Sequence, residues 1–378
     1  MKSYLPNDIK DQNRKIIYDI LLNNPPIAKI EISEMTTMSL VTVGKIIDYF
    51  ESIGILTHSN ENREGARGLG RKRNLYDFNP NSFMSIGVQI IDGKVSAVLL
   101  NLKQEVIDSL TIKKLIYFWD DQLSLVLHKI KNHFQEKLIQ YNAKLLGIGI
   151  AVDGGINTYK EIIRMKVSYA EEKEFNYHEI IKTLEKELQL PIFLENDVNA
   201  SVFCEFNQLE VNDLLEIALN NGIGAGIILN KKLYRGNNSG VGELEFMCFD
   251  LDYVAMPTSV GWLETKLNIR YLEKRFNIDF NNIKNSKKEN IYECVEYVSK
   301  YIALTICNAV SLLEISNIVL SGPVIKSMPE EIIGKIEEYI FRYTGWKFNV
   351  FFSTIEFSSA IGAGLLLIEN ELSQIIFG

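Results

Sequence analysis

The stretch GARGLGRKRNLYDFN at residues 65–79 decides the fold of the N-terminal part of this chain. Its first half is rich in glycine, which is typical of a turn, and basic side chains follow. The alternating apolar residues at 75–78 are typical of a strand. The whole chain carries a formal net charge of −8, so the electrostatic field of its net charge does not attract duplex DNA. Any DNA contact must therefore come from a local basic patch. We predict that this patch consists of Arg67, Arg71, Lys72 and Arg73.

Helical patterns precede this stretch and predict a winged helix-turn-helix domain over residues 1–80. Asn7 or Asp8 is expected to cap a first helix that ends before Pro25, and a second, short helix follows. Ser39 is expected to cap a third helix that ends at Gly54, and the strands 55–57 and 75–78 would form the wing. The third helix should turn mostly small and polar side chains outward, which suits the major groove; these are Ser39, Leu40, Thr42, Lys45 and Tyr49.

We expect Ser39, Thr42 and Lys45 to face base edges, and the basic residues of the wing to reach the phosphate backbone. The alternative is a three-helix interaction module with a solvated basic loop. The position of the arginines directly after the third helix favours DNA.

The rest of the chain alternates strands and helices, which predicts two α/β lobes. The expected strands are 85–90 and 94–101 around an Asp92-Gly93 turn, then 146–151, 215–219, 227–229 and 317–320. A helix is expected at 120–141 and a terminal helix from about Ser358, with a glycine loop at 221–226. Ligands of such folds bind at strand ends and between lobes. The aromatic residues at 339–352 are expected to pack in the core or, alternatively, to form a dimer interface.

Four stretches of this body resemble the ROK family of repressors, open reading frames and sugar kinases: LGIGIAVDGGI (146–156), LPIFLENDVNASVFCE (190–205), NNGIGAGIILNKKLYRGNNSGVGELEFM (221–247) and SSAIGAGLLLIE (358–369). Repressors of this family, such as the xylose and N-acetylglucosamine regulators, also carry an N-terminal winged helix. The resemblance implies a two-lobed actin-like, ribonuclease-H-like ATPase fold. It places residues 81–194 and 358–378 in the first lobe, residues 195–357 in the second, and a sugar cleft between them.

Departures from the ROK kinase pattern favour a repressor over a kinase. ROK kinases hold phosphate and Mg²⁺ with an Asp-x-Gly-Gly-Thr motif, whereas this chain has Gln89, Ile91, Asp92 and Gly93 at the aligned positions. Gln89 lacks the anionic oxygen that Mg²⁺ prefers, and Ile91 and Asp92 hinder a close backbone approach to phosphate. The glycines at 222–226 fit either a nucleotide loop or a simple tight turn. We therefore expect no ATP cofactor and no catalysis.

Asn196 and Asp197 match the family's sugar-binding pair, and Glu243 and Glu264 match two further sugar-binding glutamates. A carboxylate can accept hydrogen bonds from two hydroxyls, and an amide can both donate and accept hydrogen bonds. Both groups are therefore suited to binding a polyol. The alternative is that these four are ordinary surface or capping groups.

Two elements of the ROK pattern are missing. Phe246 stands where the family has a histidine that touches sugar and zinc, and Cys248 alone replaces a cysteine-rich zinc loop. One cysteine cannot build a tetrahedral thiolate site, so we expect no metal. Because the four cysteines are scattered without a CxxC pair, we predict free, buried thiols at all of them. Phe246 would either stack under a sugar or fill the space that the metal loop leaves.

These patterns together predict a sugar-responsive DNA-binding repressor of carbohydrate genes, released by its effector. It would act in the cytoplasm as a homodimer on operator DNA, without contact to a membrane. The competing interpretations are an ATP-dependent sugar kinase with a DNA-binding head, and a regulator that has lost its sugar site.

Overall fold

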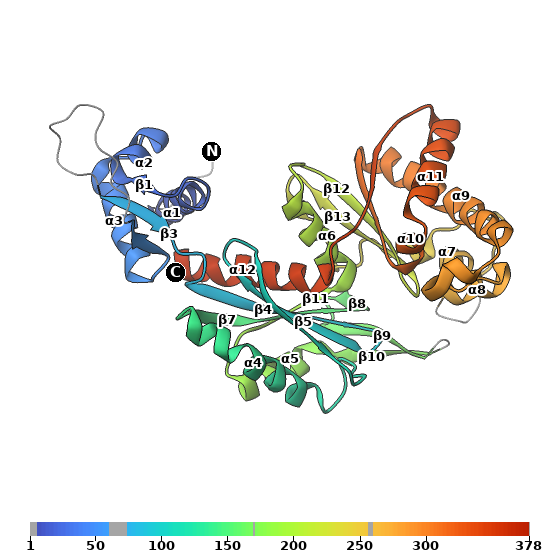
Figure 1. Ribbon diagram of the computed structural model, residues 1–378, viewed down its shortest axis with the longest axis horizontal. Helices are drawn as coiled ribbons and strands as arrows, with labels where there is room; N and C mark the ends of the chain where they lie inside the picture. The colour runs from blue at the N-terminus through green and yellow to red at the C-terminus, as the bar shows by residue number, and fades with distance from the viewer. Residues whose placement is uncertain (1–5, 60–73, 169–170, 256–259, 378) are drawn as a thin grey trace.

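The computed structural model describes residues 6–59, 74–168, 171–255 and 260–377. A small N-terminal head is followed along the chain by two larger α/β lobes (Figure 1). The last helix returns to the first lobe and runs along it toward the head. No helix within the described ranges is long and apolar enough to cross a membrane.

The head is a winged helix-turn-helix. Its helices are α1 (Pro6–Asn23), α2 (Lys29–Thr36) and α3 (Leu40–Ser52), and its strands are β1 (Ile27–Ala28), β2 (Leu56–His58) and β3 (Leu75–Phe78), in the order β1-β3-β2. Ser39 caps α3 as predicted, because its hydroxyl accepts a hydrogen bond from the Thr42 amide at 3.1 Å. The cap predicted for the first helix is wrong. The helix already begins at Pro6, since the fixed φ of proline suits a first helical position.

The first lobe is built on a five-stranded sheet in the order β11-β7-β4-β5-β6. Its strands are β4 (Phe83–Ile91), β5 (Lys94–Asn101), β6 (Val106–Ile112), β7 (Lys144–Val152) and β11 (Ile192–Asn196). Apolar side chains of α4 (Leu123–Gln140) and α5 (Tyr177–Leu188) cover one face. The other face packs against α12 (Ser358–Phe377). A separate antiparallel sheet follows β7 and consists of β8 (Gly154–Asn157), β9 (Ile162–Ser168) and β10 (Glu171–Asn176).

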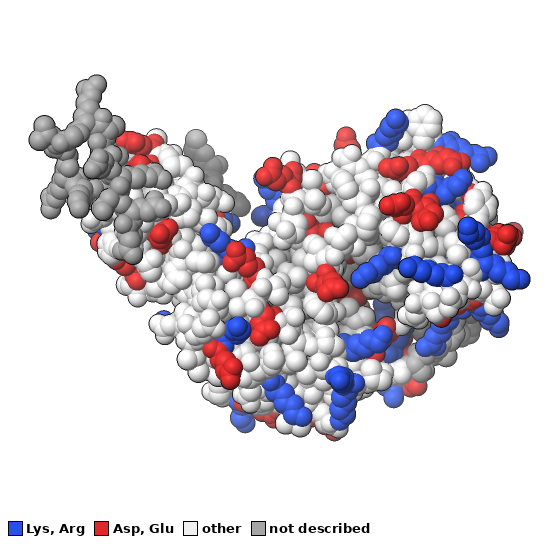
Figure 2. Space-filling model, in the orientation of Figure 1, with Lys and Arg blue, Asp and Glu red and all other residues white. Residues whose placement is uncertain are grey.

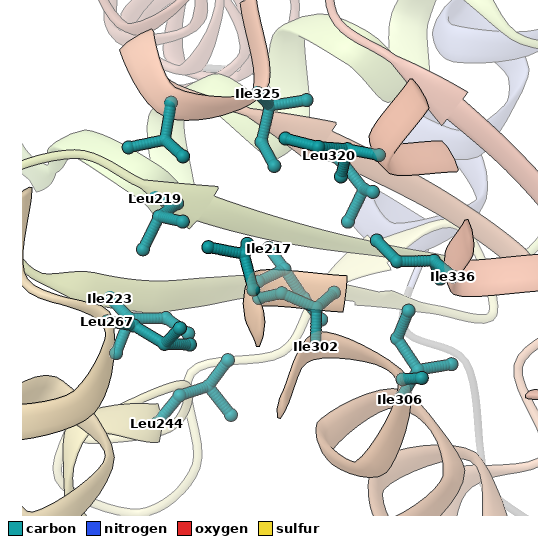
Figure 3. Packing of buried hydrophobic residues seen from close by; sticks show 14 of the residues in the cluster. Ile217, Leu219, Ile223, Leu244, Leu267, Ile302, Ile306, Leu320, Ile325 and Ile336 are labelled. Atoms are coloured by element: carbon teal, nitrogen blue, oxygen red, sulfur yellow. The ribbon is translucent and has the colours of Figure 1, made fainter. Parts of the chain in front are cut away.

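The second lobe has the strand order β14-β13-β12-β15-β16. Its strands are β12 (Leu214–Leu219), β13 (Ile223–Leu229), β14 (Lys232–Leu233), β15 (Asn317–Ser321) and β16 (Asn349–Phe352). One face packs against α6 (Asp197–Gln208). On the other face, side chains such as Ile217 and Leu320 pack against Ile302 and Ile336 of two long helices (Figure 3). The helical elements of this lobe are η1 (Leu244–Phe246), α7 (Trp262–Leu267), α8 (Ile269–Phe276), η2 (Phe280–Asn285), α9 (Lys288–Leu313), α10 (Pro323–Ser327) and α11 (Pro329–Thr344).

Two sequence-based expectations fail in the second lobe. The predicted glycine loop at 221–226 is shorter, because Gly224 and Gly226 belong to β13. A Cβ at position 226 would lie 2.6 Å from the carbonyl oxygen of Val198, so the glycine lets α6 approach the sheet. The aromatic segment does not simply fill the core, since Phe341 and Trp346 are 55% and 52% exposed although Tyr339 is buried.

Candidate functional site

A group of polar side chains lies at one edge of the first sheet, where parallel strands end. β11 pairs with β7 so that Asn196 lies opposite Val152, and Asp153 follows directly. β4 is parallel to β7 and ends beside them, and the Asp92 amide donates a hydrogen bond of 2.8 Å to the Asp153 carboxylate. The carboxyl ends of parallel strands are the usual ligand-binding edge of α/β sheets.

Asn196 has a structural role at this edge. Its Oδ1 accepts hydrogen bonds from the Val198 and Asn199 amides at 3.0 and 3.1 Å, which caps α6. Its Nδ2 donates to the Gly154 carbonyl at 3.1 Å and to Asp197 Oδ1 at 3.2 Å. Both donors and both acceptor positions of this amide thus have partners within the protein. Asn196 is therefore a capping amide of α6 in this structure.

Asp197 and Asp153 form an acidic pair next to this cap. Asp197 is 5% exposed, and burial, together with the nearby Asp153 carboxylate, raises the pKa of Asp197 well above its ordinary range. Burial also raises the pKa of Asp153 to about 7. Two close carboxyl groups in a low-dielectric site cannot easily ionise together. The raised pKa values favour protonation of this pair, and a protonated carboxyl can donate as well as accept hydrogen bonds.

Glu264 and Glu243 approach the same region from the second lobe. Glu264, on α7, is 4% exposed and binds Lys166 of β9, with Nζ at 2.6 and 2.8 Å from its two oxygens. Lys166 also lies 3.4 Å from Glu245 Oε2. Glu243 Oε1 lies against Gly155, because a Cβ at position 155 would be only 3.0 Å from it.

Burial is the main cause that raises the pKa of Glu243, and the positive charges of Arg164 and Lys166 oppose it. The structure therefore brings Asn196, Asp197, Glu243 and Glu264 into one region, around Gly154, Gly155 and Lys166.

The position of the kinase phosphate motif is occupied by contacts within the protein. Gln89 Oε1 accepts a hydrogen bond of 3.3 Å from the Ala360 amide at the start of α12. Asp92 adopts a left-handed conformation with φ 51° in the turn between β4 and β5. Of the glycines at 222–226, only Gly222 lies in the turn between β12 and β13, and Glu264 lies against it, since a Cβ at position 222 would be 2.5 Å from Glu264 Oε2.

The candidate DNA-binding surface lies at the N-terminal end of α3. Ser39 and Lys45 are exposed and Thr42 is half-buried, while Val43, Ile46, Ile47 and Phe50 face the head core. Tyr49 does not face outward as predicted, because its hydroxyl donates a hydrogen bond to the Ile375 carbonyl of α12. The predicted phosphate contacts Arg67, Arg71, Lys72 and Arg73 lie outside the described residues. Over the face of the body seen in Figure 2, basic side chains are interspersed with acidic ones.

A family model described as "ROK family" matches residues 86–370. The chain belongs to the ROK family. It is 21% identical to the xylose repressor of Bacillus subtilis (strain 168), over 97% of both chains. Its fold is similar to that of a ROK family transcriptional regulator, a homolog of the E. coli MLC protein, with a TM-score of 0.75, 19% identity and 98% of each chain covered. It is also similar to ROK hexokinase from Thermus thermophilus, with a TM-score of 0.62, 19% identity, and 76% of this chain and 100% of that chain covered. The predicted fold class and family are thus confirmed.

The donors of this ROK chain do not fit the zinc site that the family pattern implies. Cys248 is exposed, and its thiol lies 3.3 Å from the Asp250 carbonyl. Phe246, at the position of the family histidine, is 54% exposed and so does not fill a buried space. Within the described part of the chain, no three His, Cys, Asp or Glu side chains are grouped to hold a metal ion. The four cysteines are free as predicted, and three are buried, but the prediction of a buried thiol is wrong for Cys248.

Several residues of this region were not among those predicted from the sequence. They are Lys166, Asp153, Arg235 and Glu195. The last two form an ion pair, with Arg235 Nη2 2.7 Å from the buried Glu195 carboxylate. Asp153 could have been found, because it directly follows a predicted parallel strand. Lys166 and Arg235 carry no local signal, since their partners are distant in the sequence.

Proposed function

We propose that this ROK protein is a transcriptional regulator that binds operator DNA through its head and responds to a sugar held between the two lobes. The observation that carries this proposal is the winged helix-turn-helix, whose third helix exposes Ser39, Leu40 and Lys45 at its N-terminal end. The relatedness to xylose repressors supports it. We further propose that it acts in the cytoplasm, as expected for a protein that binds operator DNA. We also propose that it is not an enzyme, because Gln89 and Asp92 make protein contacts at the positions aligned with the kinase phosphate motif.

The proposed DNA contact is tested by changing Arg71 and Arg73 together to alanine. Operator duplex recovered from a randomised library by the unaltered protein serves as the probe. The double variant should bind every duplex more weakly, and the slope of log affinity against log salt should fall by roughly one unit for each phosphate that the variant no longer neutralises. Unchanged affinity and unchanged salt dependence would remove these residues from the interface.

The proposed effector site is Asn196, Asp197, Glu243 and Glu264. A thermal-shift screen with D-xylose and other pentoses, hexoses and sugar phosphates identifies the ligand, because a ligand at 100 times its Kd adds roughly 2.7 kcal/mol to stability. Asp197→Asn keeps the shape of the side chain but removes the ionisable group. We expect this variant to lose the effector response and keep its operator affinity. A normal response would place the site elsewhere.

A second candidate is a regulator whose effector is not a neutral sugar. The hydrogen-bonding groups of Asn196 are already satisfied, and Lys166 already binds Glu264, so a neutral polyol would have to displace contacts within the protein. An anionic ligand such as a sugar phosphate would compete with Glu264 for the Lys166 ammonium through charge-assisted hydrogen bonds, which a neutral sugar does not offer. Lys166→Met separates the two, because it should abolish the response to a sugar phosphate and spare the response to a neutral sugar.

The kinase alternative is tested directly by a coupled ATPase assay with the same sugars. We expect no turnover above background, and sugar-dependent ADP release would establish an enzyme. We also propose a homodimer formed through the body, because one winged helix reads only a few base pairs and two heads can read a two-fold operator. Light scattering that shows only monomer, with and without operator, would contradict this.

A further inference from the structure

The last helix of the chain, α12, connects the proposed effector site with the head. It begins beside the proposed effector site, where Ser358 Oγ lies 2.9 Å from Ser201 Oγ of α6 and the Ala360 amide binds Gln89. From there it runs along the first lobe to the base of the head, and the C-terminus of the chain lies there (Figure 1). One helix thus touches both ends of the proposed regulatory path.

At the end next to the proposed effector site, α12 and α6 are in backbone contact. A Cβ at position 362 would lie 1.7 Å from the Ala200 carbonyl oxygen, so Gly362 allows the two helices to touch. α6 begins at Asp197 and is capped by Asn196, both proposed effector-site residues. Packed protein interiors transmit displacements because they contain few voids. A shift of the α6 N-terminus must therefore move α12 or break this contact.

At the head end, two side chains of the head bind the last carbonyls of α12. Arg14 of α1 is 8% exposed and donates a hydrogen bond of 2.6 Å to the Ile376 carbonyl. Tyr49 of α3 donates to the Ile375 carbonyl, and the Arg14 guanidinium lies 4.0 Å from the centre of the Tyr49 ring. The last carbonyls of a helix lack partners within the helix and carry partial negative charge, which suits these donors. The apolar core of the head continues into this contact, since Ile17 and Leu21 belong to the same cluster as Leu372 and Ile376.

We propose that Arg14 and Tyr49 are positioning residues that fix α3 to the end of α12, so that a change at the other end of α12, next to α6, reaches the DNA-binding helix. That the signal is a sugar rests on the proposed function, but the link itself does not. Coupling through α12 requires only that the helix moves as a unit between its two ends.

The link is tested by hydrogen exchange of the full chain without ligand or DNA. Gly362→Ala forces α12 away from α6, and amides 40–52 of α3 should then exchange roughly tenfold faster, within the usual range for coupled sites. The matched control is Gly261→Ala, because a Cβ at position 261 would lie 2.2 Å from the Glu245 carbonyl oxygen in the second lobe and meets neither α6 nor α12. The proposal is overturned if α3 is unaffected while α6 changes in Gly362→Ala, or if both variants affect α3 equally.

Tyr49→Phe tests the link from the other end and still applies if Gly362→Ala does not fold. Coupling between two sites is reciprocal, so loss of this one hydroxyl should speed the exchange of amides 197–208 by severalfold with little change in Tm. Tyr18→Phe is the control, because the Tyr18 ring packs on Phe50 and Phe78 inside the head. Unchanged exchange at 197–208 in Tyr49→Phe would overturn the proposal. Because neither experiment uses sugar or operator, such a failure would leave the proposed function standing.

Discussion

At the scale of single residues, the most unusual group is the carboxyl of Glu216. It is fully buried, accepts hydrogen bonds from Ser201 and Ser321 through Oε1, and within the described residues has no partner for Oε2. Burial raises its pKa from an ordinary 4.5 to about 8. The protonated form is therefore favoured by folding, and this stabilisation is complete below about pH 4.5 and is lost as the pH rises through 8. We expect Glu216→Gln to match the unaltered protein near pH 4.5 and to exceed its stability by roughly 3–6 kcal/mol at pH 9. Thermal unfolding across this pH range measures the effect, with the exposed Glu34→Gln as control. A constant difference at every pH would refute the assignment.

At the scale of one element, Ser39 has two proposed roles at the start of α3. Its hydroxyl caps the helix, and we predict that it also lies next to DNA. Ser39→Ala removes the cap and should lower stability by about 1 kcal/mol. Ser39→Asp keeps a capping oxygen but adds a negative charge, so it should preserve stability and weaken binding to any duplex by repelling phosphate. Thermal unfolding and fluorescence anisotropy with a non-specific duplex separate the roles. If Ser39→Asp binds DNA as well as the unaltered protein, the N-terminal end of α3 does not face the backbone.

At the scale of the whole molecule, a few ionic contacts join the first sheet and its β9 hairpin to the second lobe. Arg235 follows β14 of the second lobe and binds Glu195 of β11 at 2.7 Å, and the Glu195 side chain is 5% exposed. Arg235→Ala would leave this carboxylate buried without its ion-pair partner, which we expect to cost roughly 1–3 kcal/mol and to favour separation of the lobes. Small-angle X-ray scattering should then show a larger radius of gyration. The control is Lys173→Ala, which breaks an exposed pair with Glu171. Unchanged scattering together with unchanged stability would show that this pair does not hold the lobes.

The sequence by itself determined the features that depend on local patterns. The Ser39 cap, the two strands of the wing, the Asp92-Gly93 hairpin and the start of α12 at Ser358 were all predicted correctly, because capping, turn chemistry and periodicity act over a few residues. The family resemblance likewise matched Asn196, Asp197, Glu243 and Glu264 to sequence motifs of the ROK family. Their role in binding a sugar and the division into domains remain predictions.

Only the tertiary structure decided what these residues contact. It gave the Asn196 amide a capping role, paired Glu264 with Lys166, and turned Tyr49 from the expected DNA surface to the end of α12. Tyr49 and Ile375 are separated by 326 positions, and no local pattern encodes a partner at that distance. Such contacts exist because the packing of α12 against the sheet, α6 and α1 brings the two ends of the chain together. The partner of a buried polar group depends on which distant element covers it.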